Sequence, residues 1–304
     1  MTKDATILVI GSANADFVIH TDKMPVLGET RHGSGFAVNA GGKGLNQAVA
    51  IAKLGGDTAF VGAIGQDPNG SALLDALSDA HVPFLGVSLP EHTTGVAMIT
   101  VVNGDNFILL HDGANQALTP ERIEEKADLI READFLVLQL ETPMESVACA
   151  CRIAKSHGTQ TVLNPAPYRP LPEQLLTMVD FLIPNEHEAQ ALTGIYPDTP
   201  EACTKAIQAL QGMGAKNIVI TLGERGCVYT HNDEICFCPA QPANVVDTTS
   251  AGDSFIGAFV TALSKGRSIP DAIRIGTSVA AITISRPGAA SSIPFAHELK
   301  EKLL

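Results

Sequence analysis

Short, mostly apolar runs of strand length alternate with longer amphipathic segments along most of this chain. The runs are typical of strands buried on both faces of a parallel sheet, and they lie at residues 7–10, 59–62, 135–140, 161–163, 181–183 and 218–221. The longer segments have apolar residues at helical spacing, near residues 45–54, 71–80, 120–132, 146–156, 186–192, 200–213, 253–264 and 270–284. This alternation predicts an α/β layered domain with a mainly parallel sheet.

Two regions depart from this alternation. Asn103-Gly104-Asp105-Asn106 lies between two apolar runs and is a strong hairpin signal. We expect strands from about residues 12–40 and 95–110 to project from the main sheet as a small lid. Since the sequence contains no internal repeat and no linker, we expect one domain over residues 1–304 with these lid strands inserted in it.

Composition narrows the class of protein. The chain has 304 residues, of which 45% are hydrophobic, so it can bury a substantial core. Its formal net charge of −13 disfavours a nucleic-acid or anionic-membrane surface. The six cysteines form no C-x-x-C pair, and we interpret them as buried thiols rather than metal ligands or disulfides. Without a signal pattern or a long apolar run, a cytoplasmic location is expected.

The segment Asp247-Thr248-Thr249-Ser250-Ala251-Gly252-Asp253 joins a flexible loop to an apolar helical pattern. The first N–H groups of a helix have no intrahelical partner, and the dipole there favours an anion such as phosphate. Asp253 would then lie beside the phosphate, where a carboxylate could accept a proton from an attacking alcohol. The alternative is that Asp253 is only an N-terminal helix residue and Gly252 a turn residue.

Polar side chains follow several of the predicted strands. In open α/β sheets, ligands bind beyond the carboxyl ends of the strands. Each of these residues alone is what an ordinary loop contains, but their joint placement predicts a site along one rim. Asp253 is included because it follows the strand-like residues 243–246. The set is Asn14, Asp16, Glu141, Asn185, Glu188, Thr221, Gly223 and Asp253.

The glycine-rich segment Gly41-Gly42-Lys43-Gly44 opens a predicted helix. It is not a Walker A sequence, and residues 10–14 lack the dinucleotide fingerprint, which disfavours a nicotinamide dehydrogenase. Adjacent glycines let the backbone approach a ligand closely, so Lys43 and Asn46 could bind hydroxyl groups. The alternative is a glycine-rich helix start with a solvated lysine.

Asn185-Glu186-His187-Glu188 places two carboxylates near another helix start. Such a carboxylate could hold water on a magnesium ion without ligating the ion directly. The alternative is that these acidic residues only favour the helix dipole.

With these segments in view, the chain resembles the ribokinase/PfkB family of carbohydrate and nucleoside kinases. The two family signatures match residues 41–48 and 247–253, and the N-x-x-E signature matches residues 185–188. Further matches are Leu138-Gln139-Leu140-Glu141, Asn164-Pro165-Ala166-Pro167 and Arg286-Pro287-Gly288-Ala289. The resemblance covers almost the whole length. It implies a three-layer α/β/α fold with a mainly parallel central sheet and a small β-strand lid, and a homodimer through the lid strands.

The resemblance also implies the activity. It indicates ATP-dependent phosphorylation of D-ribose to ribose 5-phosphate, with Asp253 as general base and the N–H groups of Ala251, Gly252 and Asp253 as anion hole. A kinase for 2-deoxyribose or a nucleoside is the alternative enzyme, and a sugar-binding sensor is the alternative outside catalysis. The residues implied to hold the sugar are Asn14, Asp16, Gly42, Lys43, Asn46, Glu141 and Asp253.

The same resemblance implies sites for ATP, Mg²⁺ and K⁺. Glu188 would organise Mg²⁺ through water. Ser250 stands where members usually have Gly or Ala, Leu45 replaces a common Ala, and Thr277 stands where some members have a histidine near adenine. The implied nucleotide residues are Asn185, Thr221, Gly223, Gly226, Gly252 and Thr277. The implied potassium ligands are Asp247, Thr249, Thr283, Arg286, Gly288 and Ser292.

Overall fold

The computed structural model describes residues 5–102, 105–172 and 174–299. The strands are β1 (Thr6–Ile10), β2 (Asn14–Thr21), β3 (Gly35–Gly41), β4 (Asp57–Val61), β5 (Ala63–Gly65), β6 (Val87–Leu89), β7 (Gly95–Val102), β8 (Asp105–His111), β9 (Phe135–Leu138), β10 (Gln160–Leu163), β11 (Phe181–Leu182), β12 (Asn217–Thr221), β13 (Cys227–His231) and β14 (Glu234–Cys238). The α-helices are α1 (Lys43–Lys53), α2 (Pro68–Asp79), α3 (Pro120–Glu124), α4 (Ala127–Glu132), α5 (Met144–His157), α6 (Glu186–Thr193), α7 (Pro200–Gly212), α8 (Ala251–Ser264) and α9 (Ile269–Thr283). Across the described residues, each helix is too short or too polar to span a lipid bilayer.

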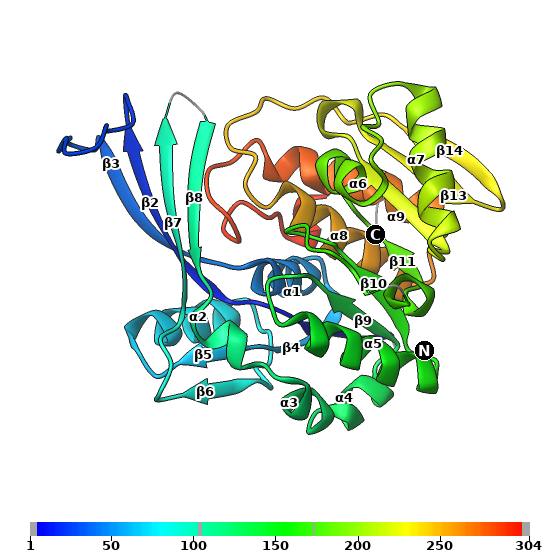
Figure 1. Ribbon diagram of the computed structural model, residues 1–304, viewed down its shortest axis with the longest axis horizontal. Helices are drawn as coiled ribbons and strands as arrows, with labels where there is room; N and C mark the ends of the chain where they lie inside the picture. Colours follow the sequence, from blue (N-terminus) through cyan, green and yellow to red (C-terminus); the bar gives the residue numbers. More distant parts are fainter. Residues whose placement is uncertain (1–4, 103–104, 173, 300–304) are drawn as a thin grey trace.

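Eight strands form the main sheet, in the order β14-β13-β12-β11-β10-β9-β1-β4. In Figure 1 this sheet runs from β4 near the bottom to β14 at the upper right. The strands from β4 to β12 pair in parallel, whereas β13 and β14 extend the sheet antiparallel. The mainly parallel sheet predicted from the apolar runs is confirmed. Parallel pairing brings the carboxyl ends of six strands to one edge, where ligands bind in such folds.

Helices cover both faces of the main sheet. Along β1, Ile7 and Val9 face one buried cluster with α1, α2, α8 and α9, while Leu8 and Ile10 face another with α3 to α7. This alternation follows from the two-residue period of a strand. Full burial of such a side chain contributes roughly 1.5–3 kcal/mol, so both faces stabilise the sheet. The result is three layers, helix on sheet on helix.

A second sheet of four strands, in the order β3-β2-β7-β8, stands apart from the main one at the left of Figure 1. We call it the lid sheet. β2 runs parallel to β7, and the two outer pairs are antiparallel. At its base, Asn14 pairs with both Gly41 and Gly95, just beyond the end of β1. Residues 103–104, in the hairpin turn predicted from the sequence, lie outside the described residues.

One face of the lid sheet is apolar and open to solvent. Residues that pair directly across neighbouring strands share a face, and the register places these apolar side chains together. Five of these side chains have exposed fractions of 49% to 76%, which is unusual for apolar side chains that lie together on one surface. The face is made by Phe17, Ile19, Phe36, Val38, Met98, Phe107 and Leu109.

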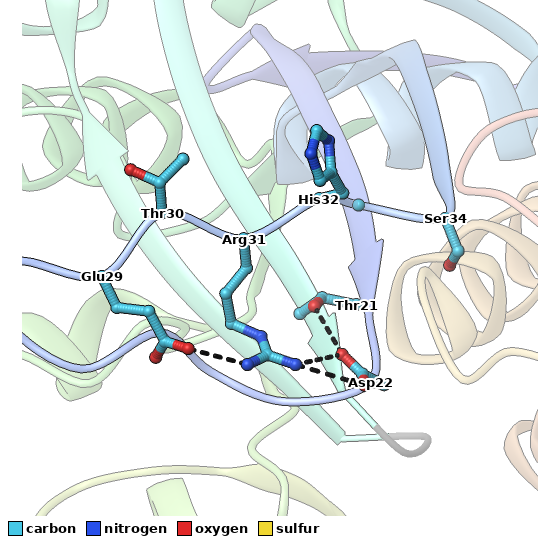
Figure 2. A pocket seen from close by; sticks show the side chains of 8 residues that line it. Thr21, Asp22, Glu29, Thr30, Arg31, His32 and Ser34 are labelled. Atoms are coloured by element: carbon cyan, nitrogen blue, oxygen red, sulfur yellow. Dashed lines mark hydrogen bonds and ion pairs between the residues drawn. The ribbon is translucent and has the colours of Figure 1, made fainter.

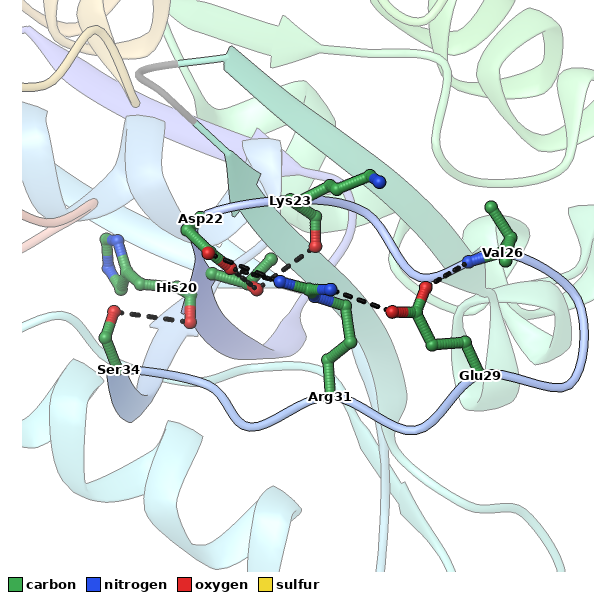
Figure 3. A network of polar contacts seen from close by, with 8 residues as sticks. His20, Asp22, Lys23, Val26, Glu29, Arg31 and Ser34 are labelled. Atoms are coloured by element: carbon green, nitrogen blue, oxygen red, sulfur yellow. Dashed lines mark hydrogen bonds and ion pairs between the residues drawn. The ribbon is translucent and has the colours of Figure 1, made fainter.

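The loop between β2 and β3 is held by Arg31. Its guanidinium contacts Asp22 at 3.0 Å and Glu29 at 2.8 Å, around a shallow hollow (Figure 2). Glu29 also accepts from the Val26 N–H, so the ion pairs and this hydrogen bond close the loop on itself (Figure 3). Exposed ion pairs of this kind are weak in water. The hollow is therefore explained by the fold of the loop.

The start of α1 depends on glycine. Gly42 has a φ of 88°, in the region that only glycine adopts readily. A Cβ on Gly44 would collide with the backbone of Gly11 and Ser12. Because no side chain intervenes, α1 begins directly against the loop after β1, and the Leu45 N–H donates to the Ser12 carbonyl at 3.0 Å.

Three predictions from the sequence were wrong in detail. Residues 243–246 form an exposed loop, because Pro242 lacks a donor N–H and no described strand pairs with the segment. The helix predicted at residues 120–132 is divided into α3 and α4, since Lys126 leaves helical geometry. All six cysteines are free, but Cys236 and Cys238 are only half-buried on an edge strand.

Candidate active site

Asp253 lies in the first turn of α8 and is 7% exposed. Its Oδ1 accepts from Nε2 of Gln47 at 2.9 Å, and its Oδ2 accepts from Nδ2 of Asn46 at 3.2 Å. Both donors belong to the first turns of α1, so two helices that are remote in sequence meet at this carboxylate. The contacts fix both oxygens of the group, with N–H donors that suit a carboxylate.

The N-terminus of α8 is open. Ser250 occupies the N-cap position with a φ of 60°, which is uncommon for a residue other than glycine. Its hydroxyl makes no capping hydrogen bond and is buried without a partner in the described structure. The Ala251 N–H donates to the Thr248 carbonyl at 3.2 Å. Among the described residues, nothing accepts from the N–H groups of Gly252 and Asp253. These two groups and the helix dipole favour an anion at this point.

Lys43 is the positive centre of the site. Burial alone would lower the pKa of its ammonium group. The negative charges of Asp253, Glu141, Glu188 and Asp16 outweigh burial and raise the pKa. Four carboxylates from β2, α6, α8 and the loop after β9 therefore act on one lysine, and the predicted sugar-binding residues are brought together.

The carboxylates also act on one another. Burial raises the pKa of Asp16 to about 7, and the charges of Glu141 and Asp253 contribute to the rise. Burial raises the pKa of Glu188 as well, against the Asn185 N–H and the Lys43 charge. The site holds more negative charge than Lys43 neutralises, so a ligand that donates several hydrogen bonds would relieve it.

Two of the predicted sugar-binding side chains are oriented by neighbours. Glu141 accepts from the Ser12 hydroxyl at 2.5 Å and from the Lys43 N–H at 3.1 Å. The Oδ1 of Asn14 accepts from the buried Asn115 amide at 2.8 Å, which leaves the NH₂ group of Asn14 to donate elsewhere. Each side chain is thus held with part of its hydrogen-bonding capacity unused.

Asn46 and Asp16 complete this part of the site. The Oδ1 of Asn46 is buried and has no partner in the described structure, although its Nδ2 binds Asp253. Buried acceptors are almost always paired, so this oxygen fits a ligand hydroxyl that would donate to it. The Asp16 carboxylate lies flat against Gly41, where any Cβ would displace it.

Two cavities meet at the start of α8. They share the wall made by Thr221, Gly223, Thr248, Ala251 and Gly252. One, of about 460 Å³, is polar and continues to Lys43, Asn185, Glu188 and Asp253. The other, of about 700 Å³, is mostly apolar and continues to Gly226, Val245, Phe255, Thr277, Ala280, Ala281 and Ile284.

The predicted nucleotide residues are divided between these cavities in a way that suits their roles. Asn185 lines only the polar cavity, whereas Gly226 and Thr277 line only the apolar one. The Thr277 hydroxyl already donates to the Arg274 carbonyl at 2.9 Å. A molecule with an apolar ring at one end and an anionic chain at the other would fit across both.

Glu188 and Asn185 form a capping box at the start of α6. The Asn185 side chain accepts from the Glu188 N–H at 2.8 Å, and the Glu188 carboxylate accepts from the Asn185 N–H at 2.9 Å. Asn185 and Glu188 therefore cap α6 with each other's side chains. The carboxylate nevertheless lines the polar cavity, so the cap does not remove it from the site.

Asp247 connects the loop before α8 to the segment after α9. Its carboxylate accepts from the Thr249 N–H at 2.9 Å and from the Gly288 N–H at 3.0 Å. Burial would raise the pKa of Asp247, but hydrogen bonds from Thr249 and Gly288 lower it overall. Thr283 and Ser292 are buried, and their hydroxyls donate to backbone carbonyls. Carboxylate, hydroxyl and carbonyl oxygens are the ligands that a hard cation prefers, so the residue types suit one.

Sequence reasoning missed three buried residues of this site. Ser12 binds Glu141, Gln47 binds Asp253, and Asn115 binds Asn14. Gln47 lies within the family signature at residues 41–48, and this was the sequence feature that could have identified it. Ser12 and Asn115 carry no signal of their own, because their partners are 129 and 101 residues away in the chain.

A profile of the pfkB family carbohydrate kinases matches residues 4–296. The chain belongs to that family. The ribokinase of Staphylococcus aureus is 38% identical over 97% of this chain and 98% of its own length. The structure of an Arabidopsis thaliana ribokinase complexed with ribose and ATP superposes with a TM-score of 0.91, at 33% identity over 96% of each chain. The deoxyribokinase of Salmonella typhi is 36% identical over 98% of each chain. The ribokinase-like α/β fold expected from the sequence is confirmed.

The raised pKa of Asp16 leads to a prediction about stability. A buried acid with a raised pKa stabilises the folded state fully below its unfolded value of 3.8, and this stabilisation is lost as the pH rises through about 7. Without ligands, Asp16→Asn should therefore be more stable than the parent at pH 8, by as much as about 4 kcal/mol, and the gain should shrink at pH 5. Urea unfolding at both pH values measures it.

The control for this prediction is Asp22→Asn, on the exposed loop. Hydrogen bonds from Arg31 hold the pKa of Asp22 below its usual value, so this variant should gain no stability at pH 8. If Asp16→Asn were less stable than the parent at pH 8, the charge crowding described above would be wrong.

Proposed function

We propose that this carbohydrate kinase transfers the terminal phosphoryl group of ATP to the 5-hydroxyl of D-ribose. The observation that carries the proposal is the first turn of α8, where one carboxylate lies with two N–H groups that have no acceptor among the described residues. Asp253 would accept the hydroxyl proton, and the N–H groups of Gly252 and Asp253 would stabilise charge on the phosphoryl oxygens. The likeness to a ribokinase that binds ribose and ATP supports this choice of substrates.

Phosphoryl transfer requires mainly positioning and charge stabilisation. The attacking oxygen must lie between Asp253 and the phosphorus atom, and the polar cavity leads to that point. The proton would move from the hydroxyl to the carboxylate as the new bond to phosphorus forms, and ADP would leave with the electron pair of the broken bond. Ala251 is a weaker contributor to the anion hole, since its N–H already donates to Thr248.

The sugar would lie under the lid sheet, between β2 and α1. Asp16 and Glu141 would accept from its hydroxyls, whereas Lys43, the Gly42 backbone and the NH₂ group of Asn14 would donate to them. The buried Oδ1 of Asn46 supports this placement, since a sugar hydroxyl would satisfy it. A site of such groups discriminates against ligands that leave them unpaired.

ATP would lie across the two cavities. We propose that the adenine ring occupies the apolar cavity near Gly226 and Thr277, and that Asn185, Thr221 and Gly223 line the phosphates. Glu188 would hold water on the Mg²⁺ that accompanies ATP, and this ion would neutralise phosphate charge. A magnesium ion bound with a nucleotide requires only one or two carboxylates, and Glu186 and Glu188 both line the polar cavity.

We also propose a K⁺ site beside the anion hole. Asp247 would provide a carboxylate oxygen, and carbonyl or hydroxyl oxygens would come from Thr249, Thr283, Arg286, Gly288 and Ser292. Asp247 already joins the loop before α8 to the segment after α9, so a cation here would stiffen the loop that carries the open N–H groups.

The whole chain would act as one kinase domain, with the lid sheet closing over the sugar. We propose that the apolar face of the lid sheet packs against the same face of a second copy, which would remove it from water and give a homodimer. A monomeric mass by light scattering at micromolar concentration would contradict this assembly.

Catalysis is tested with Asp253→Ala and a sugar panel. The variant should lose about 10³-fold or more in kcat while it still binds ribose by calorimetry, because the base acts on the proton and other residues hold the sugar. For the parent, kcat/KM should be higher for D-ribose than for 2-deoxyribose or a nucleoside. ADP release measures both quantities.

The same experiment separates the alternatives. A preference for 2-deoxyribose would favour the function of the Salmonella relative. Ribose binding without ADP formation by the parent would identify a sugar sensor. Full turnover by Asp253→Ala would remove the assignment of the base.

The K⁺ site predicts an ion-specific effect on the protein itself. Potassium chloride should raise both kcat and the melting temperature of the parent relative to tetramethylammonium chloride at the same ionic strength. Asp247→Ala should abolish both differences. Equal melting temperatures of the parent in the two salts would refute the site without reference to activity.

A further inference from the structure

Four side chains from four elements form a buried chain of hydrogen bonds that ends at Asp253. Gln139 follows β9, and its Nε2 donates to Oε1 of Gln47 on α1 at 2.6 Å. The Nε2 of Gln47 donates to Oδ1 of Asp253 at 2.9 Å and lies 3.4 Å from Oδ1 of Asn164, which follows β10. Gln47 has no exposed surface. This chain of hydrogen bonds therefore acts on Asp253 from the interior of the protein.

The direction of this chain is set by a main-chain carbonyl. Asn164 donates its Nδ2 to the Ile183 carbonyl at 3.0 Å, and a carbonyl can only accept. Hence Oδ1 of Asn164 must face Gln47, and Gln47 must turn its NH₂ group toward Asn164 and Asp253. Its Oε1 then faces Gln139, which supplies an N–H. The Gln47 amide thus presents a donor, and never its oxygen, to the carboxylate.

Packing alone does not account for Gln139. Its Oε1 is buried with no partner in the described structure, and an unpaired buried acceptor destabilises a fold. Room for it exists only because residue 11 is glycine, since a Cβ there would collide with Oε1. An apolar side chain of the same size would leave no such oxygen. The N–H that Gln139 gives to Gln47 is the contact that distinguishes it from an apolar residue.

An oriented donor matters because the Asp253 carboxylate could otherwise rotate. The last torsion of aspartate is broad, so packing alone defines it poorly. Asp16 and Glu188 repel the carboxylate, and Lys43 attracts it. Gln47 fastens Oδ1 on the buried side. Within the described residues, Oδ2 has one hydrogen-bond donor, Asn46, so this oxygen can change partners when a sugar hydroxyl arrives.

We propose that Gln47 is a positioning residue that aims the general base, and that Gln139 and Asn164 orient Gln47. This inference rests on the proposed function, because it assigns the base role to Asp253. Gln47 acts on the position of the carboxylate and touches neither substrate. Its loss should therefore lower kcat and leave sugar binding nearly intact.

The test replaces Gln47 by methionine, which has similar length and no donor. Gln47→Met should lower kcat for ribose phosphorylation by about 10- to 100-fold, with the KM for ribose within about threefold of the parent, because a small misplacement of a catalytic group is costly. Thr161→Val is the matched control. Thr161 is fully buried, and its hydroxyl binds Met178 and Asp180, which are not part of the hydrogen-bond chain to Asp253. Loss of this hydroxyl should therefore leave kcat unchanged.

A second measurement separates positioning from general damage. In an Asp253→Ala background, Gln47→Met should cause no further loss of the residual rate, because Gln47 acts through the absent carboxylate. A further fall of similar size would show a structural role and overturn the proposal. So would an unchanged kcat for the single variant in a parent that phosphorylates ribose. If the parent itself releases no ADP with ribose, the proposed function fails first.

Should Gln47→Met not fold, Gln139→Met decides the matter. Residue 139 contacts neither Asp253 nor the sugar, and this substitution removes only the N–H that donates to Oε1 of Gln47. Its kcat should fall roughly threefold to tenfold at an unchanged KM for ribose. A Gln139→Met enzyme with the kcat of the parent would contradict the orientation of Gln47 by this chain.

Discussion

The close crossing of helices α1 and α8 is the constraint on which the candidate active site depends. Gly257 of α8 packs so near α1 that a Cβ would collide with the Ala50 side chain and lie tightly against the Ile51 backbone nitrogen. At this separation, Asn46 and Gln47 reach the Asp253 carboxylate. The other end of the constraint is Gly44, which seats α1 against the loop after β1. Small residues at the crossing thus determine where the Asp253 carboxylate lies.

The candidate site is crowded with negatively charged side chains. Burial and neighbouring carboxylates raise the pKa of Asp16 to about 7, and the charge of Lys43 faces four acidic groups. Hydrogen bonds from the hydroxyl groups of a ligand would offset the repulsion among these carboxylates. The chain as a whole is acidic, so an anionic ligand would have to be held by local groups such as Lys43 and the α8 N-terminus.

Much of the fold could be predicted from the sequence, because buried parallel strands appear as unbroken apolar runs. Residues 7–10 are such a run, and β1 follows it closely. Val245 and Val246 are also β-branched apolar residues, but they lie exposed in a loop. A strand forms only where a neighbouring strand can pair with it, and the composition of a segment does not reveal that neighbour. Residues of the candidate site could be predicted where they belong to a local sequence motif, as Gly42 and Asp253 do. Gln139 and Asn164 could not be assigned roles, because these depend on distances between elements.

The central claim is that Asp253 stands within reach of both the sugar hydroxyl and the terminal phosphate. A crystal structure with ribose and a non-hydrolysable ATP analogue tests it most directly. The account predicts the carboxylate within hydrogen-bond distance of the 5-hydroxyl, with Oδ1 still on Gln47 and the Gly252 N–H directed at the terminal phosphate. A carboxylate turned away from both ligands, with the phosphate remote from α8, would contradict it.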